Sequence, residues 1–407
     1  MSDVVIVGGG IGGLVTALAL HRHGIGATVL EQGSGRRELG VGLNVLPHAG
    51  RVLDELGVLD RLAGIGVRTA EMTYAHRFGM PVLRRPVGLD AGFDLPQVAC
   101  HRGRLQRMLC DTVLERLGPD AIRTGSRVTG VDPGRARATL ASGEVVEGDV
   151  LVGADGIHSV VRDRLHPGEG PPRWNGVAMW RGATDWPAFR GGRSMIVAGG
   201  NDAKLVIYPI GPGARPDTVL TNWAVCIRTG ADGDAPPQRQ DWARLADPAD
   251  PARHAHRFRL DEIDHHALIA ATAESYEFPM CDRDPLPHWT RGRTTLLGDA
   301  AHPMFPMGSN GAGQAILDAE ALARHLGTAR DPATALAAYQ DERLPVTSDV
   351  VLRNRLGGPE QVIDEVERRA PDGFDRLADV IADDELDTIF SGYHRASGNA
   401  PEQVRRP

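Results

Sequence analysis

The chain has 407 residues, enough for two or three domains at roughly 150 residues each. Its net charge of −8 opposes broad electrostatic attraction to nucleic acid or to an anionic membrane, so we expect neither as a partner. Lys204 is the only lysine, which excludes Schiff-base chemistry at every other position and a lysine-containing phosphate loop.

Cysteines and histidines give no sign of a disulfide framework or a metal site. The four cysteines include no C-x-x-C pair and are too few and too widely spaced for a disulfide framework or a zinc site. This favours a reducing compartment. No basic leader precedes the first apolar run, and charges or glycines interrupt every hydrophobic stretch. We therefore expect a cytoplasmic protein without a membrane span. We also expect no metal, because the clustered histidines lie among charged residues: His254, His256, His265 and His266.

The first part of the chain has the pattern of a parallel sheet with crossover helices. A β-branched apolar run at residues 3–7 is followed by glycines and by an apolar helix that ends near Gly24. This order of strand, turn and helix is typical of right-handed crossovers. Further elements are expected as a strand at 27–30, a helix at 104–117, a hairpin at 138–146 and a strand at 149–152.

The middle of the chain changes character. Short apolar or alternating runs between Gly, Pro and Asp clusters predict antiparallel strands at 176–181, 194–198, 205–210 and 219–227. The pattern of buried strands and apolar helices seen in the first part of the chain then returns, with a buried strand at 294–297 and a helix at 311–326. From residue 353 the chain is charged and helical, and we expect its polar tail, 397–407, to be disordered.

These patterns predict an α/β protein in which a discontinuous Rossmann-like domain is joined to a sheet-rich domain and C-terminal helices. The predicted nucleotide-binding domain comprises 1–73, 100–170 and 281–352, the sheet-rich domain 74–99 and 171–280, and the C-terminal segment 353–407.

The first motif is a glycine fingerprint between the first strand and the first helix. Gly8, Gly10 and Gly13 fit G-x-G-x-x-G, whose missing side chains let a pyrophosphate approach backbone N–H groups at a helix N-terminus. Glu31, at the end of the second strand, can accept a hydrogen bond from a ribose hydroxyl. Together these features predict dinucleotide binding. The alternative is a glycine-rich turn that only packs helix against strand.

Two further motifs follow predicted strands. One contains Asp155 and Arg162 in Gly-Ala-Asp-Gly-Ile-His-Ser-Val-Val-Arg, and the other contains Asp299 and His302 in Gly-Asp-Ala-Ala-His-Pro. Ligands of a doubly wound sheet gather at the carboxyl ends of its strands, so both aspartates are candidates for contact with the nucleotide. Turn or helix-cap duty is the alternative for each. His302 could act as a general base, but the turn geometry of its segment is the favoured interpretation.

The three motifs occur in this order, and the segment His101-Arg102-Gly103-Arg104-Leu105-Gln106 lies between the first motif and the second. In this arrangement the chain resembles the single-component FAD-dependent aromatic hydroxylases of the para-hydroxybenzoate hydroxylase-like family. Segments 39–44, 179–182, 208–210 and 282–289 are most similar to the phenazine-carboxylate monooxygenases of pyocyanin formation. The resemblance implies FAD as cofactor and NADH or NADPH as a transient cosubstrate. The FAD-binding residues that it implies, together with neighbouring positions of the motifs, are Gly8, Gly10, Ile11, Gly13, Glu31, Gln32, Val41, Gly42, Arg102, Gln106, Asp155, Gly156, Arg162, Gly298, Asp299 and Gly311.

The same resemblance directs attention to the run before the helix at 311–326. Its N–H groups and helix dipole are suited to the negative charge of reduced flavin, so the catalytic candidates are Pro306, Gly308, Asn310 and Gly311. The substrate candidates are Met179, Arg181, Ile196, Tyr208, Trp223, Phe305 and Pro306, with Arg181 as a partner for a carboxylate. Alternation along strands does not identify the face of each, so core packing stays open as their alternative.

The function implied is an FAD-dependent monooxygenase that uses NAD(P)H and O₂ to hydroxylate an aromatic secondary metabolite through a flavin C4a-hydroperoxide. The substrate is expected to be polycyclic or carboxylated and phenazine-like, as in antibiotic biosynthesis, with decarboxylation left open. A monomer and a homodimer are both compatible with the sequence. The alternative function is a flavin-containing binding protein that sequesters an aromatic antibiotic without turnover.

Overall fold

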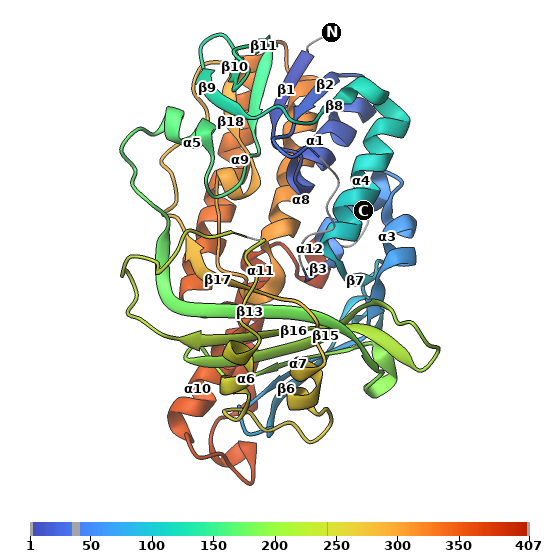
Figure 1. Ribbon diagram of the computed structural model, residues 1–407, viewed down its shortest axis with the longest axis vertical. Helices are drawn as coiled ribbons and strands as arrows, with labels where there is room; N and C mark the ends of the chain where they lie inside the picture. The colour runs from blue at the N-terminus through green and yellow to red at the C-terminus, as the bar shows by residue number, and fades with distance from the viewer. Residues whose placement is uncertain (1–2, 35–40, 242, 405–407) are drawn as a thin grey trace.

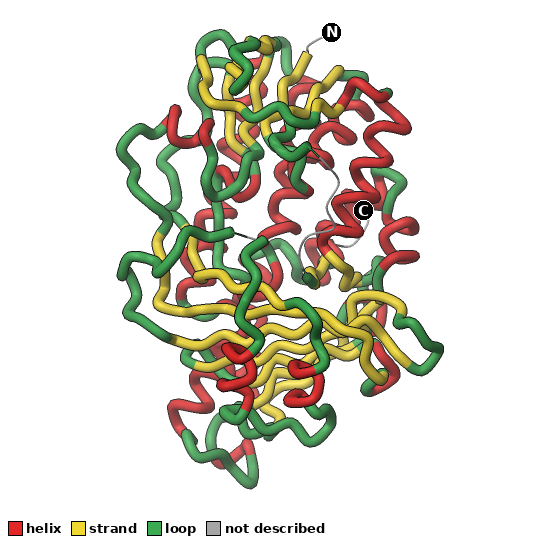
Figure 2. Tube along the Cα trace, in the orientation of Figure 1, coloured by secondary structure: helices red, strands yellow, loops and turns green. Residues whose placement is uncertain are grey.

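The computed structural model describes residues 3–34, 41–241 and 243–404 (Figure 1). Leu39 and Gly40, which belong to one of the family-like segments, lie outside the described residues. Figure 2 shows two regions, one of mixed strands and helices and one dominated by a broad sheet. Long C-terminal helices extend along both.

The first region is built on a parallel sheet whose strands come from distant parts of the chain. Its order is β18-β12-β1-β2-β8, and every pairing is parallel. This confirms the predicted α/β class, because β-branched and leucine side chains fill the strands and are buried. The strands are β1 (Asp3–Val7), β2 (Gly26–Leu30), β8 (Ile122–Arg123), β12 (Val150–Gly153) and β18 (Thr294–Leu296).

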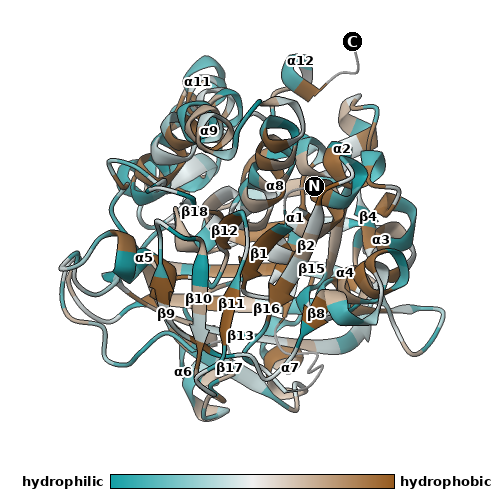
Figure 3. Ribbon diagram, turned by 90° about the horizontal axis from the view of Figure 1, so that it is seen from above, coloured by the Kyte–Doolittle hydropathy of each residue, from teal (hydrophilic) through white to brown (hydrophobic). Residues whose placement is uncertain are grey.

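Helices cover one face of this sheet and a small antiparallel sheet covers the other. The covering helices are α1 (Ile11–Arg22), α4 (Arg102–Leu117) and α8 (Gly311–Thr328). Apolar residues of β9 (Val128–Asp132) and β10 (Arg137–Leu140) join the same core, and β11 (Val145–Glu147) completes the small sheet. Seen from above, β1 and β12 are hydrophobic and central, whereas α4 and α11 carry hydrophilic residues at the periphery (Figure 3).

The second region is a seven-stranded sheet, which confirms the predicted antiparallel strands. Its order is β17-β13-β16-β15-β14-β5-β6, antiparallel except where β14 pairs with β5. The long strands cross below the first region (Figure 1). Their bounds are β5 (Glu71–Ala75), β6 (Pro81–Pro86), β13 (Arg173–Pro187), β14 (Ser194–Ala198), β15 (Ala203–Pro212), β16 (Thr218–Arg228) and β17 (Ser275–Asp282).

The two faces of this sheet differ. One packs against α6 (Ala249–Ala255) and α7 (His265–Ala270) in a closed core that includes Trp180, Leu205 and Val225. The other face is directed toward the first region. Because side chains alternate along a strand, residues next to those of the closed core lie on this second face.

Smaller elements link the two regions. A three-stranded sheet has the order β3-β7-β4, formed by β3 (Gly42–Val45), β7 (Gln97–His101) and β4 (Val67–Thr69). The remaining helices before the C-terminal segment are α2 (Pro47–Glu55), α3 (Leu59–Ile65) and α5 (Val160–Leu165). The residue boundaries of the two predicted domains stay a prediction.

The C-terminal segment is helical as predicted, with α9 (Pro332–Arg355), α10 (Gln361–Arg369), α11 (Asp383–Ala396) and α12 (Pro401–Val404). The expected disorder of the tail is wrong over its described part. The Ser397 carbonyl accepts a hydrogen bond from Gln314 Nε2 at 2.9 Å, and Asn399 Oδ1 lies 3.0 Å from His48 Nδ1. Polar groups thus fasten the tail to α8 and α2. No helix within the described ranges is long and apolar enough to span a membrane.

Candidate active site

A cavity lies between the parallel sheet and the second face of the seven-stranded sheet. Its walls come from the glycine loop, β3, the turns after β12 and β18, the start of α8 and the C-terminal helices. Strands β13, β14, β15 and β16 form its floor. The motifs that were far apart in the sequence therefore meet around one space.

The glycine fingerprint forms the nucleotide end of the cavity. Gly8 has φ +110°, and a Cβ there would lie 2.4 Å from the Ala154 carbonyl oxygen. A Cβ at Gly13 would lie 2.0 Å from the Gly8 oxygen, so neither position admits a side chain. Gly10 has no atom within 4 Å of its ideal Cβ and lines the cavity at the start of α1. This open helix N-terminus fits a pyrophosphate.

Glu31 and Gln106 hold the glycine loop from behind. Glu31 accepts hydrogen bonds from the N–H groups of Gly9 and Gly33, at 2.8 and 2.7 Å. Gln106 Nε2 donates to the Gly9 carbonyl at 2.7 Å. These side chains do not line the cavity, and neither do Gln32 and Val41.

Asp299 and Arg102 both line the cavity. Asp299 follows β18 through Gly298, whose φ is +59°. Within the described ranges no hydrogen bond to its carboxylate is found, although burial raises its pKa against the opposing effects of His302 and Arg102. Burial lowers the pKa of Arg102, and Asp299 opposes that change. A ligand that carries both hydroxyl groups and phosphates fits this pair.

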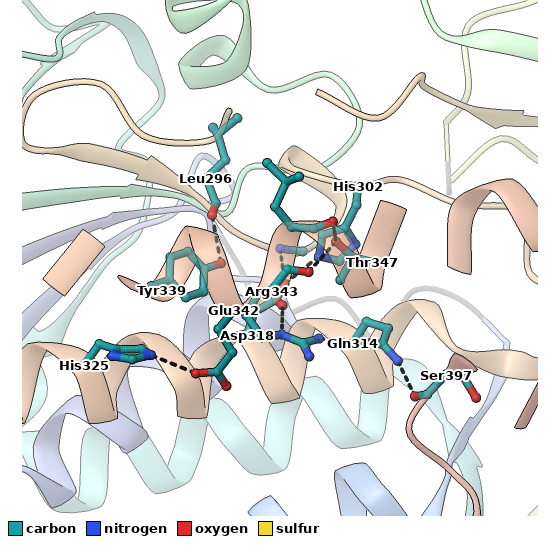
Figure 4. A network of polar contacts seen from close by, with 12 residues as sticks. Leu296, His302, Gln314, Asp318, His325, Tyr339, Glu342, Arg343, Thr347 and Ser397 are labelled. Carbon is teal, nitrogen blue, oxygen red and sulfur yellow. Dashed lines mark hydrogen bonds and ion pairs between the residues drawn. The ribbon is translucent and has the colours of Figure 1, made fainter. Parts of the chain in front are cut away.

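A buried network holds the Asp299 turn in place (Figure 4). Asp318 of α8 accepts hydrogen bonds from the Gly298 N–H at 3.1 Å, from Arg343 Nε at 2.8 Å and from His302 Nε2 at 2.6 Å. Burial raises the pKa of Asp318, but His302 and Arg343 outweigh it, so the net direction is downward. His302 therefore braces the turn and does not face the cavity, as the favoured interpretation held.

The predicted catalytic loop borders the cavity at the start of α8. Pro306, Gly308 and Gly311 line the cavity, and Gly308 and Ser309 have φ of +62° and +58°. The backbone of Ser309 is strained, since residues that carry a Cβ atom rarely adopt a positive φ. Asn310 does not line the cavity; its Nδ2 donates to the Gly308 carbonyl at 3.2 Å and to Tyr393 Oη at 3.0 Å. Asn310 thus stabilises the loop from behind.

The second motif supplies bracing contacts. Asp155 accepts hydrogen bonds from Ser159 Oγ at 2.5 Å and from the Val160 N–H at 2.8 Å, as expected for a turn at the start of α5. Arg162 is fully buried and donates to the carbonyls of Ala300 and Ala301. Neither lines the cavity, whereas Gly156 does. The turn-and-cap alternative therefore describes the contacts of Asp155, and Arg162 supports the Asp299 turn.

The substrate candidates divide between the two faces of the seven-stranded sheet. Met179, Arg181 and Tyr208 line the cavity, as does Pro306 from the loop above. Ile196 and Trp223 were predicted to contact substrate, but they lie in the closed core on the opposite face. Trp223 Nε1 donates to Thr272 Oγ1 at 2.8 Å, which fixes the ring beside α7.

Phe305 packs behind the cavity wall. Its ring joins Met179, Phe278 and Met307 in a buried cluster, and its carbonyl accepts a hydrogen bond from Asn354 Nδ2 at 2.8 Å. It supports the cavity without lining it.

Arg181 has donors directed to the cavity end near β3. Its Nη2 donates to the Gly42 carbonyl and, at 3.2 Å, to Tyr208 Oη. Its Nε is buried and has no hydrogen-bond partner among the residues that the structure describes. Burial raises the pKa of Tyr208, opposed by the positive charge of Arg181. A carboxylate at this end would meet a cation and a neutral phenol.

Sequence reasoning missed the part of the wall contributed by the C-terminal segment. Glu360, Phe390 and His394 line the cavity, and so does Lys204 from β15. Burial lowers the pKa of His394 to about 4, so its ring is neutral at pH 7. The signal available for Lys204 was its status as the only lysine. The charged helical pattern after residue 353 gave no sign of a cavity wall.

The family profile described as "FAD binding domain" matches residues 1–354. The chain therefore belongs to this family of FAD-dependent proteins, and the resemblance to its aromatic hydroxylases is confirmed. FAD is its cofactor, and the glycine fingerprint, Arg102 and Asp299 provide a site that fits it.

Two relatives make this membership more specific. The chain is 42% identical over 365 residues to the phenazine 1,6-dicarboxylic acid hydroxylase PhzS of Lysobacter antibioticus, an alignment that covers 87% of this chain and 89% of the relative. It is 32% identical to the 3-hydroxybenzoate 6-hydroxylase 1 of Aquipseudomonas alcaligenes, with 87% and 88% covered. The fold is similar to that of Klebsiella pneumoniae HpxO solved with FAD and uric acid, with a TM-score of 0.73, 23% identity and coverage of 99% and 94%.

Proposed function

We propose that this protein is an FAD-dependent monooxygenase that uses NAD(P)H and O₂ to hydroxylate a phenazine-like aromatic carboxylate. The observation that carries the proposal is the meeting, in one cavity, of the nucleotide-binding glycine loop and an apolar floor that contains Arg181. The identity of 42% with a phenazine dicarboxylate hydroxylase supports the substrate class. Bound FAD supplies the redox chemistry by which electrons from NAD(P)H activate O₂.

The residues of the chain divide this work between binding and charge stabilisation. The N-terminus of α1 and Arg102 would hold the phosphates, and the Asp299 carboxylate would accept hydrogen bonds from ribityl hydroxyls. The N–H groups around Gly308 and Gly311, with the dipole of α8, would stabilise negative charge on the reduced ring.

The floor of the cavity would bind and orient the aromatic substrate. Arg181 would pair with a substrate carboxylate beside Tyr208, while Met179 and Phe278 provide apolar surface for a ring. Apolar walls also exclude water, which would otherwise divert activated oxygen to hydrogen peroxide. None of the four cysteines forms a disulfide, which supports a reducing compartment, and we propose that the protein acts in the cytoplasm.

The sequestering alternative is the weaker one. The relatives described above are named for hydroxylation, and the binding of an aromatic antibiotic without turnover has no support among them. Oxygen consumption would separate the two functions, because a sequestering protein binds the aromatic compound without consuming O₂.

The decisive experiment is NADH and NADPH oxidation by the purified, FAD-loaded protein with a panel of phenazine and salicylate-type acids. We expect one phenazine acid to raise the oxidation rate, with a product that gains one oxygen or exchanges carboxyl for hydroxyl in mass spectrometry. Slow oxidation that no acid stimulates would contradict the proposed substrate class. Stoichiometric binding of an acid without oxygen uptake would favour sequestration.

A further inference from the structure

The only lysine of the chain lies in the cavity wall as half of a buried ion pair. Lys204 is 4% exposed and donates to the carboxylate of Glu360, which is 7% exposed and comes from the turn before α10. Its Nζ also lies 3.1 Å from Met307 Sδ, beside the predicted catalytic loop. Both partners line the cavity. A buried pair of this kind gives little net stability compared with apolar packing, so its position requires another explanation.

Lys204 and Arg181 lie at separate places on the same cavity floor. On the strand between them, β16, Arg181 pairs with Ala224 and Lys204 pairs with Cys226. Lys204 and Arg181 are therefore separated by two inter-strand spacings across the sheet and by two residues along the strand direction. This places their Cα atoms about 12 Å apart. Between the two cations the floor consists of apolar and weakly polar side chains: Met179, Val206, Ala224 and Cys226. A single ring with one acid group reaches one cation, whereas a fused-ring frame with acid groups at opposite ends reaches both.

The Lys204 ammonium has capacity for another acceptor. An ammonium carries three donors, and its partners within the described ranges are the Glu360 carboxylate and the weakly accepting Met307 sulfur. Burial lowers the pKa of Lys204, but the Glu360 carboxylate more than offsets this and raises it, so the group is charged at neutral pH. A charged donor that faces an apolar cavity is a binding point for an anion.

We propose that Lys204 binds a second acidic group of the substrate, so that the preferred substrate is a fused-ring aromatic dicarboxylate held between Arg181 and Lys204. This inference rests on the proposed function and specifies its substrate. Glu360 balances the charge of Lys204 while the cavity is empty and competes with the substrate for the ammonium once it binds. Glu360 therefore sets how strongly the second acid group is held.

The competing explanation is that the pair only fastens the C-terminal segment to the sheet. Glu360 does contact the loop, because the Gly308 N–H lies 3.4 Å from its Oε1. The two explanations differ for the double variant Lys204→Met/Glu360→Gln, which removes the ion pair without leaving either charge buried and unpaired. Loss of a purely structural pair would weaken binding of every substrate, whereas loss of an anion-binding cation would weaken binding of the dicarboxylate alone.

The test uses the oxidised holoenzyme without NAD(P)H and follows the flavin absorbance during titration with each acid. The probes are phenazine-1,6-dicarboxylic acid and phenazine-1-carboxylic acid. Lys204→Met alone would leave a buried unpaired carboxylate, so the informative variant is Lys204→Met/Glu360→Gln. We expect its Kd for the dicarboxylate to rise about tenfold or more and its Kd for the monocarboxylate to change by less than about twofold.

A matched control is the pair Arg77 and Glu367, which also joins the sheet region to the C-terminal segment but does not line the cavity. Arg77→Met/Glu367→Gln is expected to change neither Kd. Equal losses for both acids in the Lys204 double variant, or no loss for either acid, would overturn the role of Lys204 and leave the proposed function standing. Failure of the unsubstituted holoenzyme to bind or hydroxylate either acid would overturn the proposed function and this inference with it.

Discussion

The two faces of the seven-stranded sheet are made by the same strands but have opposite physical character. The face toward α6 and α7 is a closed core of aromatic and branched side chains, including Trp180 and Trp223. The face toward the nucleotide region carries Arg181, Lys204 and Tyr208 among methionines and small residues, and it borders a cavity. A sheet can therefore provide stability with one set of alternate residues and binding with the other.

Truncation of a fully buried tryptophan of the closed core is the strongest test of this division. Trp223 is fully buried, so Trp223→Ala should lower the free energy of unfolding by about 3–5 kcal/mol. Urea unfolding of the holoprotein would measure the loss. At a temperature where the variant stays folded, its KM for the aromatic acid should match that of the parent protein. A selective rise in KM would show that the closed core also shapes the cavity.

The cavity side should show the larger response of stability to pH. The folded-state pKa of His394 is about 4, below the usual value of 6.5, because the ring is buried. The unfolded chain therefore binds the proton first, and stability falls as the pH drops from about 6.5 toward 4. At pH 5 this one group should cost about 2 kcal/mol relative to pH 7.5.

Urea unfolding at both pH values would measure this effect. His394→Gln should remove this contribution to the loss of stability between pH 7.5 and pH 5. His21→Gln, which replaces an exposed histidine, should leave that loss of stability unchanged. If His394→Gln lost as much stability at pH 5 as the parent protein, the assignment of this pH effect to the His394 ring would be contradicted.

Removal of a cavity cation should affect binding and leave folding nearly intact. Arg181→Met should raise the KM for a carboxylated substrate about tenfold, through loss of a charge-assisted hydrogen bond. The exposed Arg228, on β16 of the same sheet, supplies the control Arg228→Met. Steady-state kinetics with matched acid and amide substrates would check the prediction, since only the acid should lose affinity. Equal losses for acid and amide would rule out a carboxylate partner.

The smallest effect compares neighbours that point to opposite faces. Ile196→Val removes one methyl group from the closed core and should cost about 0.5–1.5 kcal/mol without a change in kinetics. Val197 lines the cavity, so Val197→Ile should instead reduce the rate with bulky substrates more than with small ones. Thermal melts and a substrate series would measure both. A kinetic effect of Ile196→Val would break the comparison between the faces.

The class of fold could be predicted because its signals are local. The β-branched run before the glycine fingerprint and the apolar helix after it predict β1 and α1 without any tertiary information. The tail was mispredicted because its composition is polar, yet Ser397 and Asn399 satisfy buried groups of distant helices. Amino-acid composition predicts whether a segment can bury apolar surface, but it does not predict individual hydrogen bonds of this kind.

The site was predictable where a motif requires a backbone conformation and less predictable where geometry selects among similar side chains. Gly10, Gly311 and Asp299 are such motif residues, and they border the cavity with Arg181 and Tyr208. Ile196 and Trp223 were assigned to the wrong face, because the period of two defines two sets of residues and does not say which set meets the cavity.

Tyr393 carries a consequence for the order in which the protein matures. Its Oη lies 3.1 Å from the Met307 carbonyl, 2.6 Å from Asn354 Oδ1 and 3.0 Å from Asn310 Nδ2, so α11 ties down the loop that begins α8. During synthesis the nucleotide end of the cavity can form early, because its glycine loop lies at the start of the chain. The loop acquires its tether only when residue 393 has left the ribosome. The protein therefore gains the glycine loop and Arg102, which would hold the phosphates, well before the contacts that fix the reactive end.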